Sequence, residues 1–375
     1  MQTWPGQGQI HMEASDQPHG RGKDGHPDEG QGRHPHADTT ADTTADGSGD
    51  NEPMFSASTA SERMGFLLLP QFSMMAFFSA VEPLRIANRI AGRPLYEWTV
   101  IGLSGDPVTA SNGMTLMVDH AIDQVRHLPS LAVCSGFDPE QWIGRGLSAW
   151  LNRLDQGGCR IGALDTGAVV LAEAGLLAGE TVTLHWETLP AFNERYPTIR
   201  TCDELFLLGQ RRFFCAGGAA AMDMTLEMIA RQHGMALAVD VSEQLIHDRL
   251  RSRTDQQRMS LVRRLGTHQP RLIDAVSLME SHLEAPLELA EIARRSQISL
   301  RQLQRLFADE LGESPTGYYL GLRLNRAASL LKDTDLDVLA IGLSCGFGSA
   351  SSFSRAFRRH YGCSPLSYRR QDESS

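Results

Sequence analysis

An internal repeat near the C-terminus restricts the fold of this chain more than any other feature of its sequence. Seven residues recur at an offset of 50 positions: Ser299, Arg305, Phe307, Gly312, Ser314, Pro315 and Tyr318 are repeated as Ser349, Arg355, Phe357, Gly362, Ser364, Pro365 and Tyr368. Identities of these types at one fixed offset indicate a supersecondary unit that is used twice.

The first copy has the pattern of a helix-turn-helix unit. Residues 287–296 predict a short amphipathic helix, and residues 297–298 predict a turn. Ser299 follows as an N-cap, with Gln302 three residues later, which is the spacing of a capping box. The next helix is expected to bury Leu303, Leu306 and Phe307.

The second copy repeats this pattern with different outward residues. Gly346 marks its turn, Ser349 is the expected N-cap, and Phe353 and Phe357 are expected in the core. Its basic pair, Arg358 and Arg359, has no acidic neighbour before Asp372.

The outward face of the second helix in each copy is the predicted DNA-reading surface. Arginine can bind guanine through two hydrogen bonds and glutamine can bind adenine in the same way. The predicted DNA-binding residues are Arg301, Gln302, Gln304 and Arg305 in the first copy, and Ser351, Ser354, Arg355, Arg358 and Arg359 in the second. Two such helices on one rigid body would enter successive major grooves about 34 Å apart.

The net charge of the chain does not argue against DNA binding. The whole chain carries −10, but residues 270–375 contain 13 basic and 13 acidic side chains. Phosphate neutralisation is local, so a neutral domain can bind DNA if its arginines share one face.

Residues 270–370 resemble the AraC/XylS-type DNA-binding domain, including the G-x-S-P-x-x-Y ending of each half. The resemblance implies a transcription regulator, commonly an activator, that contacts double-stranded promoter DNA and RNA polymerase. The C-terminal domain is therefore expected to be all-α with two helix-turn-helix units.

Short apolar runs alternate with helical periodicity between Met64 and residue 248. Predicted strands cover 65–70, 96–103, 131–136, 160–165, 181–186 and 204–209, and predicted helices cover 73–91, 139–156, 167–177, 187–195 and 219–234. This alternation is typical of a doubly wound α/β domain, here flavodoxin-like, whose mostly parallel sheet is covered on both faces.

Composition divides the chain into four segments. Residues 1–60 are rich in Gly, His, Asp and Thr and are expected to be a disordered tail. The α/β domain is expected at 61–248, a linker at 249–269 and the DNA-binding domain at 270–375. The arginine-rich start of the linker, 249–258, is expected to be a solvated linker or helix surface, with direct contacts to phosphate as the alternative. Without a signal peptide, an apolar span or paired cysteine spacings, the sequence favours a cytoplasmic protein that has no membrane partner.

Residues 64–248 resemble the class I glutamine amidotransferase-like superfamily, in its intracellular protease/amidase branch. The matching parts are the opening strand, C-S-G at 134–136, G-A-L-D-T-G-A at 162–168, L-A-E-A-G-L-L-A-G at 171–179 and T-L-H-W at 183–186. Enzymes of that branch carry a cysteine nucleophile at a strand-to-helix elbow and a histidine after the next strand. Here the resemblance puts Asp165 at the elbow and His185 at the histidine position.

The aspartate at the elbow argues against catalysis. A carboxylate beside a histidine is a poor amidase nucleophile, and it is better suited to bind a cation or a hydrogen-bond donor. We therefore expect a sensor without catalytic residues, cofactor or metal. An amidase or protease fused to a DNA-binding module is the first alternative, and an N-terminal domain that only dimerises is the second.

A ligand pocket is expected beyond the carboxyl ends of the strands. Its predicted residues are Phe72, Ser135, Gly136, Asp165, Thr166, His185 and Trp186. An aspartate beside aromatic faces suits an ammonium group. Residues 72–89 look most like the GlxA-type regulators of choline, carnitine and betaine catabolism, which implies a quaternary ammonium inducer such as carnitine or glycine betaine. A basic amino acid such as arginine is the alternative inducer, and we expect a homodimer.

Overall fold

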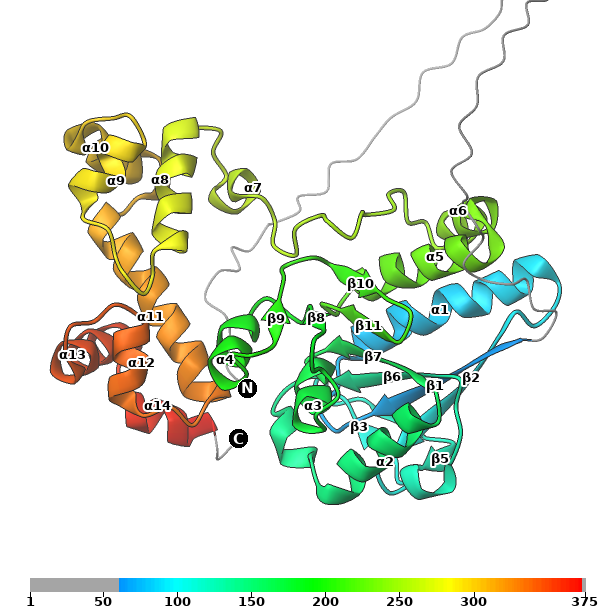
Figure 1. Ribbon diagram of the computed structural model, residues 1–375. Helices are drawn as coiled ribbons and strands as arrows, with labels where there is room; N and C mark the ends of the chain where they lie inside the picture. Colours follow the sequence, from blue (N-terminus) through cyan, green and yellow to red (C-terminus); the bar gives the residue numbers. More distant parts are fainter. Residues whose placement is uncertain (1–60, 373–375) are drawn as a thin grey trace, which may run out of the picture. The chain divides into compact units, whose positions relative to one another are not determined.

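The computed structural model describes residues 61–372, which form an α/β domain followed by a helical domain, as predicted (Figure 1). The predicted disordered tail at 1–60 lies outside the described residues. Within this described range, no helix combines the length and the apolar character that spanning a membrane requires.

A seven-stranded sheet forms the centre of the α/β domain within residues 61–248. Its strand order is β10-β11-β7-β6-β1-β2-β5. The strands are β1 (Glu62–Leu68), β2 (Tyr96–Gly102), β5 (His120–Ala121), β6 (Ser130–Ser135), β7 (Arg160–Asp165), β10 (Phe206–Leu208) and β11 (Arg212–Cys215). Every neighbouring pair is parallel except β10 with β11, so the carboxyl ends of β1, β6 and β7 lie at one edge.

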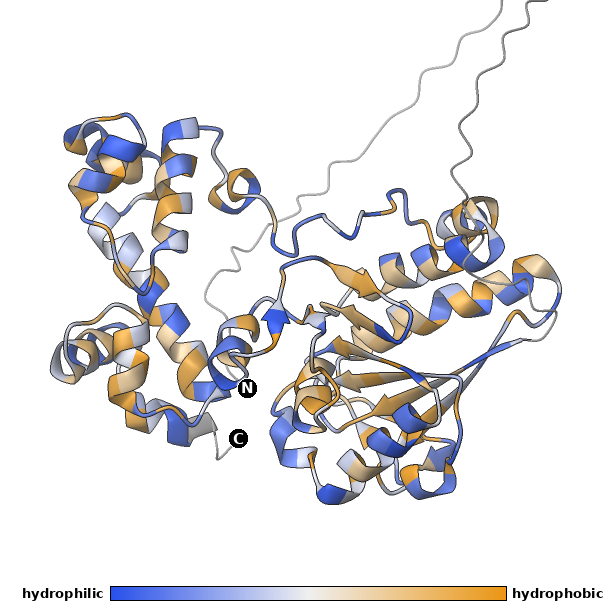
Figure 2. Ribbon diagram, in the orientation of Figure 1, coloured by the Kyte–Doolittle hydropathy of each residue, from blue (hydrophilic) through white to orange (hydrophobic). Residues whose placement is uncertain are grey.

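Helices cover both faces of this sheet (Figure 1). One face is packed by α1 (Met74–Ala91), α5 (Ala220–His233) and α6 (Met235–Gln244), and the other by α2 (Arg145–Gln156) and α3 (Gly167–Glu173). Side chains of β1 alternate between these layers: Phe66 and Leu68 belong to the first core, and Leu67 to the second. Figure 2 accordingly shows the central strands as mostly hydrophobic, which is the pattern of a sheet buried on both sides.

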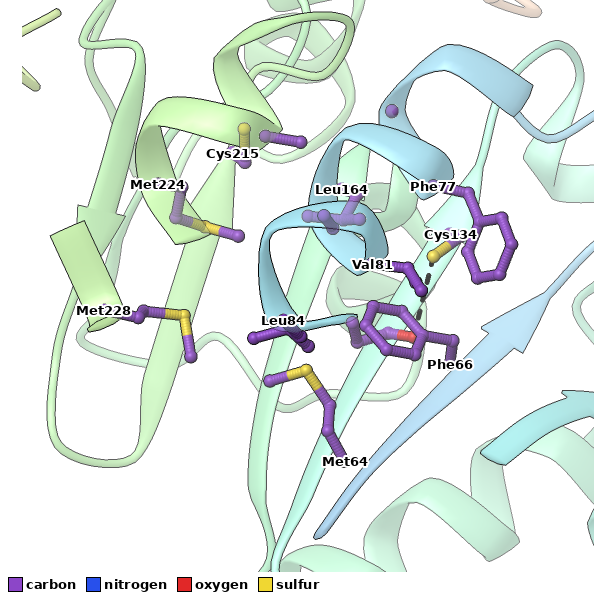
Figure 3. Close-up of a cluster of buried hydrophobic side chains, with 14 of the residues drawn as sticks. Met64, Phe66, Phe77, Val81, Leu84, Cys134, Leu164, Cys215, Met224 and Met228 are labelled. Carbon is purple, nitrogen blue, oxygen red and sulfur yellow. Dashed lines mark hydrogen bonds between the residues drawn. The ribbon is translucent and has the colours of Figure 1, made fainter. Parts of the chain in front are cut away.

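Two cysteines lie inside the first core. Cys134 and Cys215 are buried among side chains that include Phe66, Phe77 and Met224 (Figure 3). Burial raises the pKa of the Cys134 thiol and brings the pKa of Cys215 to about 12. Both thiols therefore stay protonated near neutral pH, and neither has the character of a nucleophile.

The region after α3 departs from the predicted strand and helix pattern. The predicted strand at 181–186 is only β8 (Thr181–Val182), which pairs with β9 (Arg200–Thr201) outside the main sheet. Residues 183–185 after β8 are irregular, and a turn at 186–188 leads into α4 (Leu189–Arg195). Strand β11 and helix α6 were not predicted. The short ladder β3 (Val108–Thr109) with β4 (Thr115–Leu116), and two 3₁₀ turns at Ile122–Gln124 and Pro139–Trp142, complete the domain.

Most of the arginine-rich segment after α6 is exposed, but Arg251 within it binds the α/β domain. The Asp223 carboxylate on α5 is fully buried and accepts from the backbone N–H and the Nε of Arg251, at 3.0 and 2.9 Å. His247 Nε2 lies 3.0 Å from the other side of the same carboxylate group, at Oδ1. Part of the predicted linker is also helical, as α7 (Leu261–Leu265).

The helical domain contains two helix-turn-helix units joined by one long helix. Its helices are α8 (Pro270–Ser281), α9 (Leu289–Arg295), α10 (Leu300–Leu311), α11 (Pro315–Asp333), α12 (Val338–Ser344), α13 (Ala350–Tyr361) and α14 (Pro365–Asp372). The first unit is α9 with α10, and the second is α12 with α13. Each has its own core, centred on Phe307 in the first and on Phe353 and Phe357 in the second.

The repeated residues are those that define helix ends and the aromatic core. Ser299 and Ser349 cap α10 and α13, and the capping box with Gln302 is confirmed. Gly312 and Gly362 end these helices in the left-handed conformation that favours glycine. Tyr318 packs edge-on against Phe307 at 5.4 Å between ring centroids, and Tyr368 packs against Phe357 at 5.3 Å. The repeat therefore preserves the frame of the unit and leaves its outward face free to differ.

We predict that Asp223→Ala lowers the free energy of unfolding of the α/β domain by about 3–5 kcal/mol, because it leaves Arg251 and His247 facing a cavity without their buried anion. Urea unfolding followed by circular dichroism measures the change. The matched control is Asp240→Ala on α6, since Asp240 is exposed. Equal midpoints for the two variants would show that the buried pair contributes nothing.

Candidate functional site

A pocket opens at the carboxyl edge of the sheet. The loops after β1, β6 and β7 and the segment before α4 line it, through Gln71, Ser73, Gly136, Phe137, Asp138, Glu140, Trp142, Asp165, Thr166, His185, Glu187 and Thr188. Strands β1 and β6 are neighbours at the point where the chain changes direction across the sheet. Ligand sites of open α/β sheets lie at such switch points, so the pocket is where this fold favours one.

Asp165 occupies a strained elbow at the end of β7. Its φ of 60° lies in the left-handed region, which costs a non-glycine residue about 1–3 kcal/mol. Close packing holds the turn in place. The Thr166 hydroxyl donates to Gly136 O at 2.6 Å, and a Cβ on Gly217 would lie only 2.7 Å from Asp165 Oδ2. The elbow therefore presents the carboxylate from a rigid backbone.

The electrostatic environment of Asp165 does not favour its ionised form. Burial raises the pKa of this carboxyl to about 7, and the nearby Glu187 adds to the effect. Hydrogen bonds from Ser73 and from the Thr166 backbone act in the opposite direction. Among the described residues no lysine or arginine forms an ion pair with Asp165. The pocket thus contains a half-buried carboxylate that lacks a cationic partner.

His185 and Glu187 form a second polar group on the pocket wall. The imidazole Nδ1 lies 4.0 Å from Glu187 Oε2. Burial lowers the pKa of His185 more than Glu187 raises it, so the ring is neutral near pH 7. A neutral imidazole can accept or donate one hydrogen bond, and it adds no positive charge beside Asp165.

The structure brings four of the seven predicted ligand residues to this pocket. Gly136, Asp165, Thr166 and His185 line it. Phe72 does not: its side chain is fully buried and packs edge-on against Phe77 in the core. Ser135 is also buried, and Trp186 lies beside the pocket, where the Arg258 guanidinium stacks 4.6 Å from its ring centroid.

Several pocket residues were not predicted from the sequence. A serine before an apolar helix signals only an N-cap, but Ser73 both caps α1 and hydrogen-bonds Asp165. The aromatic residues that line the pocket are Phe137 and Trp142, in place of the predicted Phe72 and Trp186. Glu187, directly after T-L-H-W, was a visible signal, since an acidic residue two positions from His185 could have been placed in the same site.

The pocket does not have the composition of a metal or nucleophile site. No group of three or more His, Cys, Asp or Glu side chains among residues 61–372 is arranged to hold a metal ion. The elbow carries a carboxylate, and Glu82 on the first helix, α1, forms an ion pair with Arg85 at 2.7 Å. The arrangement suits binding of a cation rather than attack on a carbonyl.

In the helical domain, α10 exposes the predicted DNA-reading face of the first unit. Arg301, Gln302, Gln304 and Arg305 are exposed, whereas Leu303 and Phe307 are buried and Leu306 is only partly so. Arg305 has a loose pair with Asp309, with 3.9 Å between Nε and Oδ2 and both side chains mostly in solvent. A pair of this kind is weak, so Arg305 is available to a base edge.

Helix α13 exposes a different chemistry at the corresponding positions. Ser351, Arg355, Arg358 and Arg359 are exposed, and Ser354 is half-buried. Neither Arg358 nor Arg359 forms an ion pair with another residue of the described range. Their free charge and position in the last turns of α13 suit contacts to phosphate.

Two families match this sequence over separate ranges. The DJ-1/PfpI family matches residues 63–242, and a helix-turn-helix domain family matches residues 292–371. Three similar proteins extend across both ranges. The HTH-type transcriptional regulator CdhR of Pseudomonas aeruginosa is 47% identical over 305 residues, covering 81% of this chain and 90% of that protein. The regulator GbdR of the same species is 41% identical over 81% of this chain and 83% of its own length. The regulator GlxA of Rhizobium meliloti is 36% identical over 320 residues, covering 85% of this chain and 99% of that protein.

We predict that Asp165→Asn stabilises the protein above pH 7 and has little effect below pH 4. The folded state retains the Asp165 proton up to about pH 7, whereas the unfolded state releases it near pH 4, so wild-type stability falls as pH rises between these values. At pH 8 the free energy of unfolding of Asp165→Asn should exceed that of wild type by at most about 4 kcal/mol.

Melting temperatures measured from pH 4 to pH 8 test this prediction. Asp240→Asn, a change at an exposed carboxylate, should follow the wild-type curve. Parallel curves for wild type and Asp165→Asn would mean that the Asp165 carboxyl titrates normally.

Proposed function

Because this chain belongs to the family of HTH-type transcription regulators that join a DJ-1/PfpI-type domain to an AraC-type DNA-binding domain, we propose that its α/β domain senses a small cationic metabolite and thereby controls DNA binding. The chain is a regulator and not an enzyme, as its relatives are named transcriptional regulators. The ligand and the direction of control are the proposed part.

The observation that carries the ligand proposal is the buried Asp165 carboxylate, which accepts hydrogen bonds but forms no ion pair with a cation. Removing a carboxylate from water is costly unless a cation or donors compensate for it. An ammonium group in the pocket would favour the ionised form of Asp165, with Glu187 as a second negative charge nearby. The faces of Phe137 and Trp142 in the same wall suit methylated ammonium through cation–π attraction.

A ligand with its own carboxylate fits the remaining polar groups. The buried Nε1 of Trp142 has no hydrogen-bond partner among the described residues. Such an orphaned donor is unfavourable in a folded protein, and a carboxylate could accept its hydrogen bond. We therefore propose a zwitterionic quaternary ammonium compound such as carnitine or glycine betaine as the inducer.

The segment that leads to the DNA-binding domain is fastened beside this pocket. Gln257 Nε2 donates to Thr183 Oγ1 at 3.0 Å and to Leu184 O at 3.1 Å, directly before His185. The Arg258 guanidinium stacks on Trp186, the residue after His185. A ligand that moves His185 would therefore disturb the contacts of residues 257–258, which gives a physical route from the pocket to the linker.

The remaining parts of the proposal come from the family. We propose that the protein acts as a homodimer in the cytoplasm, where it would activate promoters by contacting double-stranded DNA and RNA polymerase. A basic amino acid such as arginine is the alternative inducer. The several carboxylates in the pocket wall, including Asp138 and Glu140, favour that ligand because a guanidinium binds carboxylates through paired hydrogen bonds.

For the DNA-binding units we predict different effects of two arginine changes. Arg305→Ala should weaken binding to the operator by about 1–3 kcal/mol and relax the preference at one base position. Arg358→Ala should weaken binding to all sequences alike. It should also reduce the slope of the logarithm of the binding constant against the logarithm of salt concentration by about one. Fluorescence anisotropy with operator DNA, enriched from a random library by the full chain, and with scrambled DNA measures both effects.

The change Arg271→Ala is the control for lost charge, since Arg271 lies on α8, outside both helix-turn-helix units. If Arg305→Ala and Arg358→Ala affected specific and scrambled DNA to the same extent, the assignment of a base reader and a phosphate contact would be wrong.

We further predict that glycine betaine or carnitine raises the melting temperature of the wild-type protein and not that of Asp165→Asn. Binding to the folded state stabilises it by about 2.7 kcal/mol at a ligand concentration of one hundred times Kd. Thermal-shift assays at pH 8 should also include 3,3-dimethylbutanoate, which has the shape of glycine betaine without its positive charge, and L-arginine.

Asp240→Asn should keep the full response to the ligand. A shift with 3,3-dimethylbutanoate equal to that with glycine betaine would exclude recognition of charge. A response to L-arginine alone would transfer the proposal to the basic amino acids, and a flat response across the panel would refute a cationic ligand of this type.

A further inference from the structure

Helix α11 makes two anchoring contacts one helical turn apart, through Tyr319 and Arg323. Toward the first unit, Tyr319 OH donates to His282 O at 2.6 Å and accepts from Leu287 N at 3.2 Å. Both ends of the loop between α8 and α9 are thus bound to one hydroxyl. Tyr319 itself is buried in the core of the first unit.

Toward the second unit, the guanidinium of Arg323 binds the turn of the helix-turn-helix. Its Nε donates to Cys345 O at 2.8 Å, and its Nη2 donates to Gly346 O at 2.7 Å. Its Cζ lies 4.2 Å from the ring centroid of Phe347, a buried residue in the core of that unit. An arginine in a DNA-binding domain usually suggests phosphate, but these contacts direct this one inward.

The two anchored segments also contact each other. Gly346 has φ of 75°, and a Cβ at this position would lie 2.4 Å from Pro286 Cγ and 2.7 Å from Leu283 O. The turn of the second unit therefore rests directly on the loop of the first. The repeat offers no counterpart to Arg323, because the position 50 residues earlier is Ile273.

We propose that Arg323 is a positioning residue that fixes the second recognition helix, α13, relative to the first, α10, so that the protein reads two half-sites at one spacing only. The guanidinium Nε and Nη2 donate to two backbone carbonyls of the turn between α12 and α13, which fixes the position of that turn on α11. The Gly346–Pro286 contact stops that turn from moving toward the first unit, and Tyr319 fixes the loop against which it rests. The inference requires that both units bind DNA, as the proposed function has it.

The test uses the full chain, its enriched operator, each half-site alone and operators with one to three base pairs inserted between the half-sites. Each inserted pair rotates one half-site by about 35° relative to the other. Wild type should lose affinity steeply with each insertion. Arg323→Gln should bind the original operator at least about tenfold more weakly, because the gain from linking two modules depends on their mutual geometry. It should bind each half-site as wild type does and tolerate insertions.

Three further variants separate positioning from folding and from charge. Gly346→Ala, which disturbs the same junction without removing a charge, should also relax the spacing preference. Arg271→Gln loses the same charge at an exposed site and should retain the wild-type profile. Arg323→Lys should behave as Arg323→Gln does, since an ammonium cannot reproduce the paired donors.

Three outcomes would overturn the inference. They are a steep spacing dependence that persists in Arg323→Gln, a loss of half-site binding as large as the loss on the operator, and a wild type that has no spacing preference. Failure to enrich any operator would instead refute DNA reading by this chain, so the two proposals fail in different ways.

Discussion

The proposed ligand site depends on one unfavourable electrostatic arrangement, the burial of the Asp165 carboxylate without a cation. The parallel sheet creates this arrangement, because it brings the ends of β1, β6 and β7 to the same edge and leaves the elbow beneath their loops. In related enzymes of this fold the elbow presents a nucleophile, whereas here the same strained backbone presents an acceptor. A strained turn that serves no chemistry is retained only when the surrounding structure determines it, as Thr166 and Gly217 do here.

The pocket and the linker are connected through a few consecutive residues. Thr183 and Leu184 bind Gln257, and Trp186 stacks on Arg258, so His185 lies within the segment to which the linker is attached. The linker is also held at its start by the buried carboxylate of Asp223. A ligand can shift such an equilibrium only by the difference in its affinity for the two arrangements. In the proposed mechanism the start of the linker stays fixed at Asp223, and the contacts of Gln257 and Arg258 beside His185 are the ones that a ligand would change.

Most of the fold could be predicted from the sequence, because periodicity and caps are local signals. Ser299, the repeated glycines and the alternation along β1 are of this kind. The errors arose where tertiary contacts decide. Residues 183–186 look like a strand, yet residues 183–185 are irregular and a turn begins at Trp186, because β8 ends at Val182 and pairs outside the main sheet. Phe72 looked like a pocket residue, but the core of α1 takes its ring. Arg251 looked solvated because its partner, Asp223, lies 28 residues away in the sequence.

The two helix-turn-helix units share a frame but not a reading surface, and this difference explains why their junction matters. On our assignment the first unit discriminates bases, and the second contributes mainly phosphate contacts, which carry little sequence information by themselves. Contacts of the latter kind add specificity only if they are made at a defined distance and rotation from the first unit. A flexible junction would let Arg358 and Arg359 bind phosphates at any register, adding affinity for all DNA alike. If α11 holds the turn between α12 and α13 rigidly, the same phosphate contacts can form only at one half-site spacing.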